Sequence, residues 1–413
     1  MVALGPAADG PARPASRKKA SRIWWEVHQW VGLKFSILLS FILLTGTLAT
    51  LSHEIDWLLR PAMRVDPATV GAQVDWPAVA RTAAAEIGDG RIISLEAPVD
   101  RWFAAAAMVE AADGSLSFVY VHPTTGAFQG HGHWVGAQRI LRNMHRHLMM
   151  PVAIGVPIVT SLAVLMAISL VTSFVVYKKW WRGFLKPIRF NDLRTGLGDF
   201  HRLAGLWSLW FVTLMILTSL WYMAEALAFP APPHPSAKIE PTTQTLAAQA
   251  EALSASYRSV LATNPDLRVE RIMFPTDKSG AFVFQGQDDA ILVRARANAV
   301  WTEAQTGAVR LVADGRNLNL HQRISEAADP LHFGTFGGLA TKLVWFVFGL
   351  ALTGLSISGV AIYALRLLRA ERQPKGWGPA LAVSWRGMGP WRWPALGLVI
   401  VGLALIPTVF SQG

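Results

Sequence analysis

The chain has 413 residues, of which 52% are hydrophobic and only 16% are charged. Several apolar stretches are long enough to cross a bilayer, which excludes a soluble, nuclear or secreted protein. Cysteine is absent. Disulfides, thiol catalysis, iron–sulfur clusters, cysteine-based zinc sites and covalent haem attachment through C-x-x-C-H are therefore excluded as well.

The net charge of +11 is distributed unevenly along the chain. Lysine and arginine concentrate in residues 1–24, 178–202 and 366–393, which hold few acidic residues, whereas the rest of the chain is slightly acidic. Because lysine and arginine favour the cytoplasmic side of a membrane, this pattern predicts topology, with a cytoplasmic N-terminus. The charge needs no nucleic acid to explain it, and we expect no nucleic-acid partner.

Taken in chain order, the apolar stretches predict a membrane α-helical bundle with four core spans, a fifth C-terminal span and two extracytoplasmic α+β modules. In each module a helical stretch such as PAVARTAAAEIG precedes short alternating strands such as RIISLEAP. The predicted segments are a flexible cytoplasmic tail (1–22), span one (23–52), module one (53–142), span two (143–180), a cytoplasmic loop (181–200), span three (201–229), module two (230–331), span four (332–369), a second cytoplasmic loop (370–393) and the fifth span (394–413).

The chain also repeats itself at three landmarks that recur in the same order. The matching pairs are HQWVGL (28–33) with HRLAGL (201–206), VYVHPTTGA (119–127) with VWTEAQTGA (300–308), and NMHRHL (143–148) with DPLHFG (329–334). We infer two parallel copies of a span, a module and a span. Parallel repeats predict a pseudo-twofold axis along the membrane normal.

Four histidines occupy equivalent positions in the two copies. His28 and His201 lie at the cytoplasmic ends of spans one and three, whereas His145 and His332 lie just before spans two and four on the other side. The axis would bring each pair together, and two facing imidazoles suit a haem iron bound from both sides. We predict two haems, one near each membrane face, with a single haem as the alternative. Zinc is disfavoured because no further residues complete a tetrahedral site.

Other residues near these histidines are weaker candidates. His147 is an alternate ligand on a different helical face from His145, and His53 lacks a histidine partner in the second copy. Arg142 and Arg146 flank His145 as propionate-binding arginines would, although arginine is also common at membrane interfaces. If the helices run unbroken from His145 and His332 through the spans, both histidines lie at or above the outer interface.

Together these residues resemble the PepSY-associated transmembrane family, iron-regulated inner-membrane proteins that include ferric-siderophore reductases. The resemblance covers roughly residues 20–370 and leaves the fifth span outside. It rests on WWEVHQWVGL…LLTGTL…EID (24–56), NMHRHLMMPVAIG (143–155), GDFHRLAGLWSLWF (198–211) and DPLHFGTFGGLATKLVWFVFGL (329–350). It implies PepSY-like modules, haem b in the four-helix core with His28, His201, His145 and His332 as ligand candidates, and reduction of an iron chelate on the periplasmic side of the bacterial inner membrane.

The resulting hypothesis is a transmembrane electron conduit, an oxidoreductase. Electrons from a cytoplasmic reductase or a membrane quinol would reach a ferric siderophore held between the modules, and reduction would release Fe(II). No G-x-G-x-x-G follows a predicted strand and no Walker A motif occurs, so we expect no NAD(P)H binding. Two alternatives remain: a membrane-anchored PepSY regulatory or binding protein with structural histidines, and a siderophore or metal transporter without redox activity.

Overall fold

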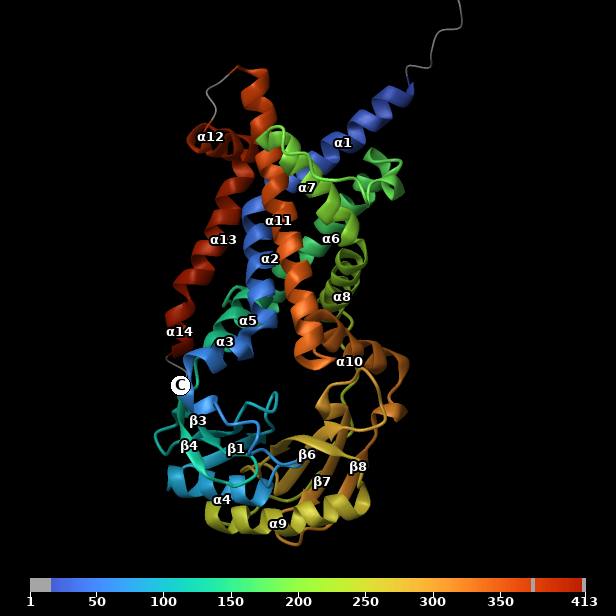
Figure 1. Cartoon of the computed structure of the whole chain (residues 1–413). Coiled ribbons are helices and arrows are strands. Elements are labelled where there is room, and N and C mark those ends of the chain that lie inside the picture. The colour runs from blue at the N-terminus through green and yellow to red at the C-terminus, as the bar shows by residue number, and fades with distance from the viewer. Residues whose placement is uncertain (1–15, 373–375, 411–413) are drawn as a thin grey trace, which may run out of the picture. The chain divides into compact units, whose positions relative to one another are not determined.

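The computed structural model describes residues 16–372 and 376–410, and these form two compact units (Figure 1). Within the described residues, unit 1 comprises 16–40, 162–212, 351–372 and 376–396. Unit 2 comprises 41–161, 213–350 and 397–410 and contains the whole β-sheet. Each unit is described separately below.

The helices account for most of the chain. They are α1 (Ser16–Lys34), α2 (Ser36–Thr50), α3 (Ser52–Leu59), α4 (Trp76–Ile87), α5 (Ala137–His147), α6 (Val152–Val176), α7 (Leu193–Trp207), α8 (Leu209–Leu227), α9 (Leu246–Thr263), α10 (Leu320–Phe333), α11 (Gly338–Ala370), α12 (Trp377–Met388), α13 (Arg392–Ala404) and α14 (Ile406–Phe410). Short 3₁₀ turns lie at Pro61–Met63, Trp180–Arg182, Ala295–Ala297, Gly315–Asn317 and Gly389–Trp391.

Four helical stretches in the described residues are long and apolar enough to cross a membrane: Val152–Val176, Leu209–Leu227, Gly338–Ala370 and Trp377–Phe410. Only 17–28% of the most apolar window of each stretch is buried within the protein. Such apolar, outward-facing helices require lipid around them, because large apolar surfaces are unfavourable in water. The protein is therefore a multi-pass membrane protein.

The helices differ from the predicted spans in two places near the termini. The first predicted span (23–52) is a pair of helices, α1 and α2, bent by 66° at their junction. Helix α1 begins at Ser16, so the end of the predicted flexible tail is helical, and residues 1–15 lie outside the described residues. The predicted cytoplasmic loop 370–393 contains helix α12, and the last three residues of the predicted fifth span also lie outside the described residues.

The strands of unit 2 form one antiparallel sheet in the order β4-β3-β2-β1-β5-β6-β7-β8. They are β1 (Arg91–Glu96), β2 (Ala105–Glu110), β3 (Leu116–Val121), β4 (Phe128–His133), β5 (Arg268–Met273), β6 (Ala281–Gln287), β7 (Asn298–Glu303) and β8 (Val309–Ala313). Strand β1 pairs with β5, with Leu95 opposite Ile272. The two sets of four strands, one in each predicted module, thus share one continuous sheet.

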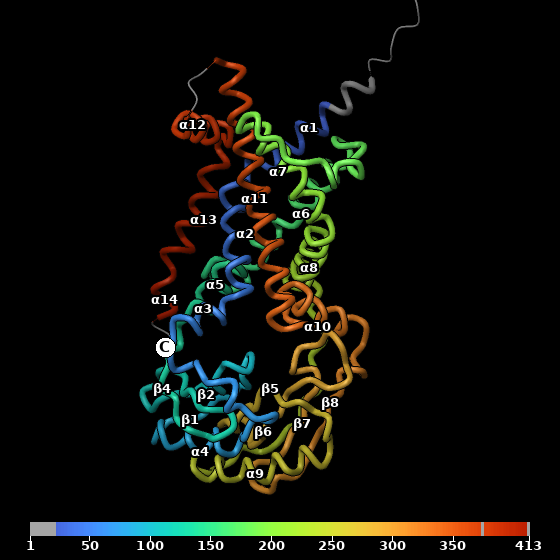
Figure 2. Tube along the Cα trace, in the orientation of Figure 1, coloured from blue at the N-terminus to red at the C-terminus, as the bar shows by residue number. Residues whose placement is uncertain are grey.

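Helices α4 and α9 lie against one face of this sheet (Figures 1 and 2). Asp75 starts α4 by accepting a hydrogen bond from the backbone N–H of Ala78, and Thr245 starts α9 by accepting one from Ala248. The core beneath the helices draws on both sets of strands and includes Leu95, Leu253 and Phe282, each fully buried. Each such side chain contributes roughly 1.5–3 kcal/mol through burial, so this shared core fixes the sheet as a single body.

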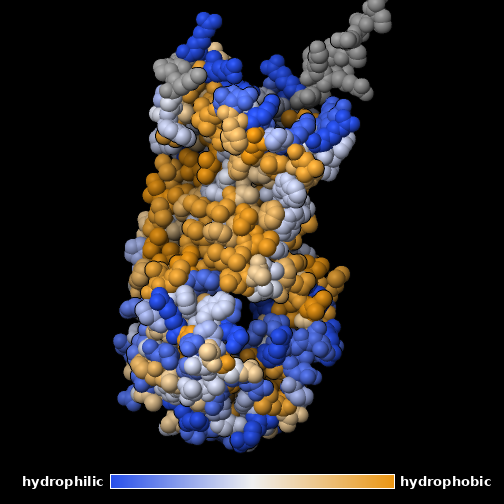
Figure 3. Space-filling model, viewed as in Figure 1, coloured by the Kyte–Doolittle hydropathy of each residue, from blue (hydrophilic) through white to orange (hydrophobic). Residues whose placement is uncertain are grey.

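The order of elements in residues 16–176 recurs in residues 193–370. Helices α1 and α2 are followed by α3, which has no counterpart in the second half, and then by α4, strands β1–β4, and helices α5 and α6. Helices α7 and α8 are likewise followed by α9, strands β5–β8, and helices α10 and α11. In the space-filling view, hydrophilic residues predominate over the strands and hydrophobic residues over the long helices (Figure 3).

Candidate functional site

The imidazoles of His145 and His332 lie close together within unit 2. His145 lies in the last turn of α5 and His332 in the last turn of α10. Their ring centroids are 6.1 Å apart and the rings are inclined by 33°. Because a metal–imidazole bond is about 2.0 Å long and the ring centroid lies about 1.1 Å further on, two imidazoles on opposite sides of one ion have centroids about 6 Å apart. The pair therefore has the spacing of two axial ligands.

Hydrogen bonds fix the tautomers of both imidazoles. Nδ1 of His145 lies 2.9 Å from the carbonyl oxygen of Ile42 in α2, an atom that can only accept, so Nδ1 carries the proton. Nδ1 of His332 lies 2.8 Å from Oγ1 of Thr218 in α8, whose own hydroxyl proton is donated to the Leu214 carbonyl. In both rings Nε2 is left with a free lone pair, as metal ligation requires.

The same arrangement occurs in unit 1 around His28 and His201. Nδ1 of His28, in α1, lies 3.1 Å from the Ser169 carbonyl oxygen and 3.0 Å from Oγ1 of Thr172 in α6. Nδ1 of His201, in α7, lies 2.9 Å from Oγ of Ser358 in α11. The two imidazoles lie close enough to interact electrostatically. The Ser358 hydroxyl donates its own proton to the Leu355 carbonyl, so it accepts from His201, and all four candidate histidines donate from Nδ1 to a neighbouring helix and leave Nε2 available.

Glycine provides the space beside two of these rings. A Cβ atom on Gly46, in α2, would lie 2.5 Å from Cε1 of His145, a distance that real side chains essentially never reach. A Cβ atom on Gly359, in α11, would lie 3.4 Å from Cε1 of His201. None of the four imidazoles is fully buried. These two glycines therefore make room for the imidazoles of His145 and His201 against the neighbouring helices.

The helices that carry His145 and His332 are separate from the membrane spans that follow them. Helix α5 ends at His147, the backbone turns through left-handed conformations at Leu148 (φ 53°) and Met149 (φ 58°), and α6 begins at Val152. Helix α10 ends at Phe333, and Gly334 (φ 67°) separates it from α11. The expectation that unbroken helices hold both histidines at the outer interface therefore fails. His145 instead lies beside Ile42 and Gly46, within helix α2.

The remaining predicted residues lie in different surroundings. His147 is 8% exposed and packs against Gly155 at the start of α6, rather than opposite His332. Arg142 lies with its guanidinium 5.8 Å from the centre of the Phe333 ring, next to His332 in sequence. Arg146 is exposed and lines no described cavity. His53 does not face a histidine and instead lines a cavity described next.

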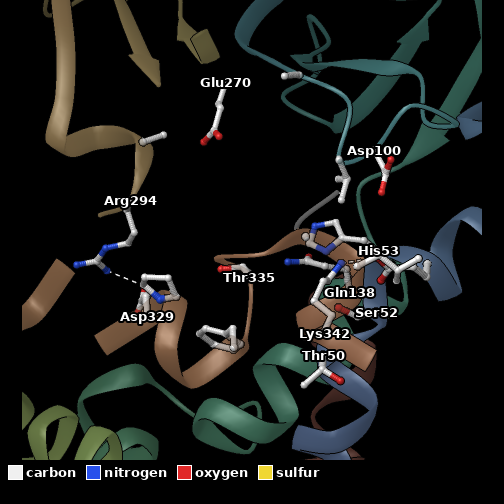
Figure 4. Close-up of a pocket in the computed structure, with 18 of the residues that line it drawn as sticks. Thr50, Ser52, His53, Asp100, Gln138, Glu270, Arg294, Asp329, Thr335 and Lys342 are labelled. Carbon is white, nitrogen blue, oxygen red and sulfur yellow. Dashed lines mark hydrogen bonds and ion pairs between the residues drawn. The ribbon is translucent and has the colours of Figure 1, made fainter. Parts of the chain in front are cut away.

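A cavity of about 480 Å³ lies in unit 2 between the sheet and the helices that carry the histidine pair (Figure 4). Its polar lining consists of Thr50, Ser52, His53, Glu54, Asp100, Gln138, Arg142, Glu270, Gln287, Arg294, Asp329, Thr335 and Lys342. Burial and the nearby Lys342 ammonium lower the pKa of His53 to about 4, so its imidazole is neutral at physiological pH. The cavity is large enough for a small chelate and offers both donors and acceptors.

Ion pairs fix the walls of this cavity. Lys342 at the start of α11 pairs with Glu54 of α3. Arg294 pairs with Glu326 and with Asp329 of α10, at 2.8 Å in each case. Burial opposes ionisation of Glu326, but hydrogen bonds and charge from Arg294 and Arg296 lower its pKa to about 2. These pairs hold α3, α10 and α11 in place around the cavity.

Asp329 also connects the cavity wall with the histidine pair. Its carboxylate accepts a 2.6 Å hydrogen bond from the Tyr222 hydroxyl of α8. The Tyr222 ring in turn lies edge-on to His332, with ring centroids 5.4 Å apart. Sequence reasoning overlooked Arg294, Glu326 and Asp329. Asp329 is the first residue of the DPLHFG motif, but nothing in the sequence indicates that Arg294 lies beside it.

Asp56 fixes the start of the helix that carries His145. Its buried carboxylate accepts hydrogen bonds from the backbone N–H groups of Ala137 and Gln138, the first residues of α5, at 2.8 and 2.9 Å. An acidic side chain at this position satisfies two unpaired donors and interacts favourably with the helix dipole.

Replacing Asp56 by alanine is expected to lower the stability of the protein by about 1–2 kcal/mol, because the α5 N-terminus loses its cap. The measurement is thermal unfolding in detergent, with Asp66→Ala as a control that removes an exposed carboxylate from a loop. An unchanged melting temperature for Asp56→Ala would show that the cap is dispensable.

The donor set at the histidine pairs determines which metal group could bind. Among the described residues, no cluster of three or more His, Asp or Glu side chains could enclose a metal ion. A paired imidazole site therefore needs its other ligands from the bound group itself, as four porphyrin nitrogens supply them. Imidazole centroids 6.1 Å apart, each ring with its Nδ1 engaged in a hydrogen bond, fit haem.

The fold and the candidate site define a multi-pass helical membrane protein that has an antiparallel sheet and two pairs of neighbouring histidines. The chain belongs to the family described as PepSY-associated TM region, whose sequence profile matches residues 25–366. The match includes all four candidate ligands. No curated protein matches the chain.

Proposed function

We propose that the protein is a haem-containing transmembrane electron-transfer protein that reduces ferric siderophores, or another ferric chelate, on the periplasmic side of the bacterial inner membrane and releases Fe(II). The His145–His332 pair carries this proposal, because its 6.1 Å spacing and fixed tautomers fit two axial ligands of one iron. An iron with both axial positions filled by protein favours electron transfer over substrate activation.

We further infer that the chain arose by internal duplication and binds two haems of the b type. The recurring order of elements and the matching Nδ1 hydrogen bonds support this inference. One histidine pair lies in each unit. Because cysteine is absent, the haems would be held by ligation and packing alone.

The protein's own residues would hold and orient the cofactor. Donation from Nδ1 to a carbonyl or hydroxyl fixes each imidazole and raises the basicity of Nε2. Arg142, which lies beside Phe333, would pair with a propionate, and Arg146 is the second candidate. When bound, haem supplies one-electron transfer.

The cavity beside Arg142 and Asp329 is the proposed site for the ferric chelate. The sequence predicts that this substrate lies between two modules, whereas in the cavity the chelate would lie against one continuous sheet. Reduction to Fe(II) weakens binding by hard oxygen ligands, so iron is released. A cytoplasmic reductase or a membrane quinol would supply the electrons, with the N-terminus in the cytoplasm as the basic segments predict.

The test is the visible spectrum and the pyridine haemochrome of the purified protein in detergent. We expect a reducible b-type spectrum with two haems per chain, and production of Fe(II) when the reduced protein is mixed with ferric tris(acetohydroxamate). Colourless, folded protein would reject the proposal in favour of a PepSY regulatory or binding protein. Uptake of the chelate by proteoliposomes without reductant would favour a transporter.

A further inference from the structure

Glu270 projects into the cavity from the middle of the sheet. It lies on β5, one of the two central strands, and its carboxyl group points into the cavity in Figure 4. Its Oε2 atom accepts a hydrogen bond from Nε2 of Gln287 on β6, at 3.3 Å. The donor contacts only Oε2, so Oε1 remains available to a ligand.

Glu270 differs from the other carboxylates that line the cavity. Glu54 is paired with Lys342, and Asp329 is paired with Arg294. Asp100 accepts a 2.7 Å hydrogen bond from the backbone N–H of Arg101. Among the described lining residues, Glu270 is thus a carboxyl group held by one long, neutral hydrogen bond, the environment in which a carboxyl group retains its proton most readily.

The side chain of Glu270 is open to the solvent of the cavity, and partial desolvation by the surrounding walls raises its pKa; the opposing effects of the Gln287 hydrogen bond and of Arg268 and Arg271 do not cancel this. Arg271 is engaged by Glu96 of β1 at 2.8 Å, which limits its effect. The charged or titratable groups that line the cavity together with Glu270 are Glu54, Asp100, Asp329, Arg142, Arg294, His53 and Lys342. Of these, Lys342 and Arg294 are neutralised by ion pairs, and His53 is neutral.

We propose that Glu270 donates the proton that completes release of iron from its chelate. This inference rests on the proposed function, which supplies the electron. Iron(III) gains one electron and becomes iron(II); the bond between iron and a basic chelating oxygen breaks, and that oxygen takes the proton of the Glu270 carboxyl group. The carboxylate left behind is reprotonated from solvent. Neither Glu270 nor the chelator is oxidised or reduced.

The proposal predicts a dependence on the chemical class of the chelate. Hydroxamate and catecholate oxygens are basic enough to take up a proton on release at neutral pH. Oxalate oxygens are weak bases and leave iron unprotonated at this pH. Glu270 therefore acts in the release of iron from the first class and not from the second.

The experiment compares the wild-type protein with Glu270→Gln, which keeps the shape of the side chain and removes its acidic proton. Each haem-loaded protein is reduced, mixed with ferric tris(acetohydroxamate) or ferric oxalate, and Fe(II) is trapped with a chromogenic chelator. We expect roughly a hundredfold slower release from the hydroxamate for Glu270→Gln, the scale of general acid catalysis. Release from oxalate, haem content and the visible spectrum should be unchanged.

The pH profile gives a second readout. Because the proton is present below the pKa of Glu270, wild-type release from the hydroxamate should fall as pH rises through that pKa, and the Glu270→Gln profile should be flat there. Glu251→Gln, on an exposed position of α9, is the matched control and should behave as wild type. Equal rates for Glu270→Gln and wild type, or equal slowing with both chelates, would overturn the proposal. Failure of the proposed function looks different, because wild-type protein would then bind no haem or release no Fe(II) from either chelate.

Discussion

Replacing His332 by alanine is expected to reduce the haem content of the purified protein from two haems per chain to one. The variant removes one of the two imidazoles whose centroids lie 6.1 Å apart, while His28 and His201 keep their hydrogen bonds in the other unit. His145→Ala should have the same effect, and His201→Ala should remove the other haem. The measurement is haem per chain by pyridine haemochrome.

The control is His131→Ala, which removes an exposed imidazole of β4 that pairs with Glu86 and lies outside both histidine pairs. His147→Ala is the more informative comparison, because His147 lies only two residues from His145 but packs against Gly155. It should retain both haems. Retention of two haems by His332→Ala, or loss of one by His147→Ala, would contradict the ligand assignment.

The pairing of the four histidines was accessible from the sequence because it follows from the repeated motifs. The motifs around His28 and His201 match directly, and those around His145 and His332 stand in the same order. The position of the His145–His332 pair could not be predicted from the sequence. It depends on left-handed backbone at Leu148 and Met149, residues that rarely adopt it and give no sequence signal. A break at Gly334 is more readily foreseen, because glycine favours such turns.

The cavity was the least predictable part of the site, because its contacts join residues distant in the chain. Glu54 and Lys342 are separated by 288 positions, and each has an ordinary interpretation as an interfacial charge when considered alone. The junction of β1 with β5 likewise joins the edges of two predicted sheets. Which strand edges pair is decided by packing under α4 and α9, and the alternating pattern within each strand carries no information about it.

Helix α10 links these two parts of unit 2, since it carries Glu326 and Asp329 on the side of Arg294 and ends with His332. The Glu326 carboxylate is fully buried and also meets Arg296 at 2.9 Å and His234 at 2.8 Å. Loss of the carboxylate would leave Arg294 and Arg296 without their main counter-charge. The orientation of α10, and with it the position of His332, therefore depends on this ion-pair cluster.

Replacing Glu326 by alanine is accordingly expected to lower the free energy of unfolding by about 1–3 kcal/mol, because it leaves the partly exposed Arg294 and Arg296 without this hydrogen-bonded partner. The effect should depend on pH. Since the pKa of Glu326 is lowered to about 2 in the folded protein from an ordinary value of 4.5, its stabilising contribution is complete above 4.5 and is lost as pH falls towards 2. The difference between wild type and Glu326→Ala should therefore shrink as the solution is acidified.

Thermal unfolding in detergent between neutral and acidic pH measures this difference. Glu303→Ala is the control, because it removes a carboxylate paired with the exposed Arg310 at the surface of the sheet, a kind of pair that contributes at most about 1 kcal/mol. Equal destabilisation by the two variants would show that the Glu326 cluster is no stronger than a surface pair. A large loss for Glu326→Ala, accompanied by weaker haem retention at His332 and not at His201, would establish that the buried ion pairs position the ligand as well as stabilise the fold.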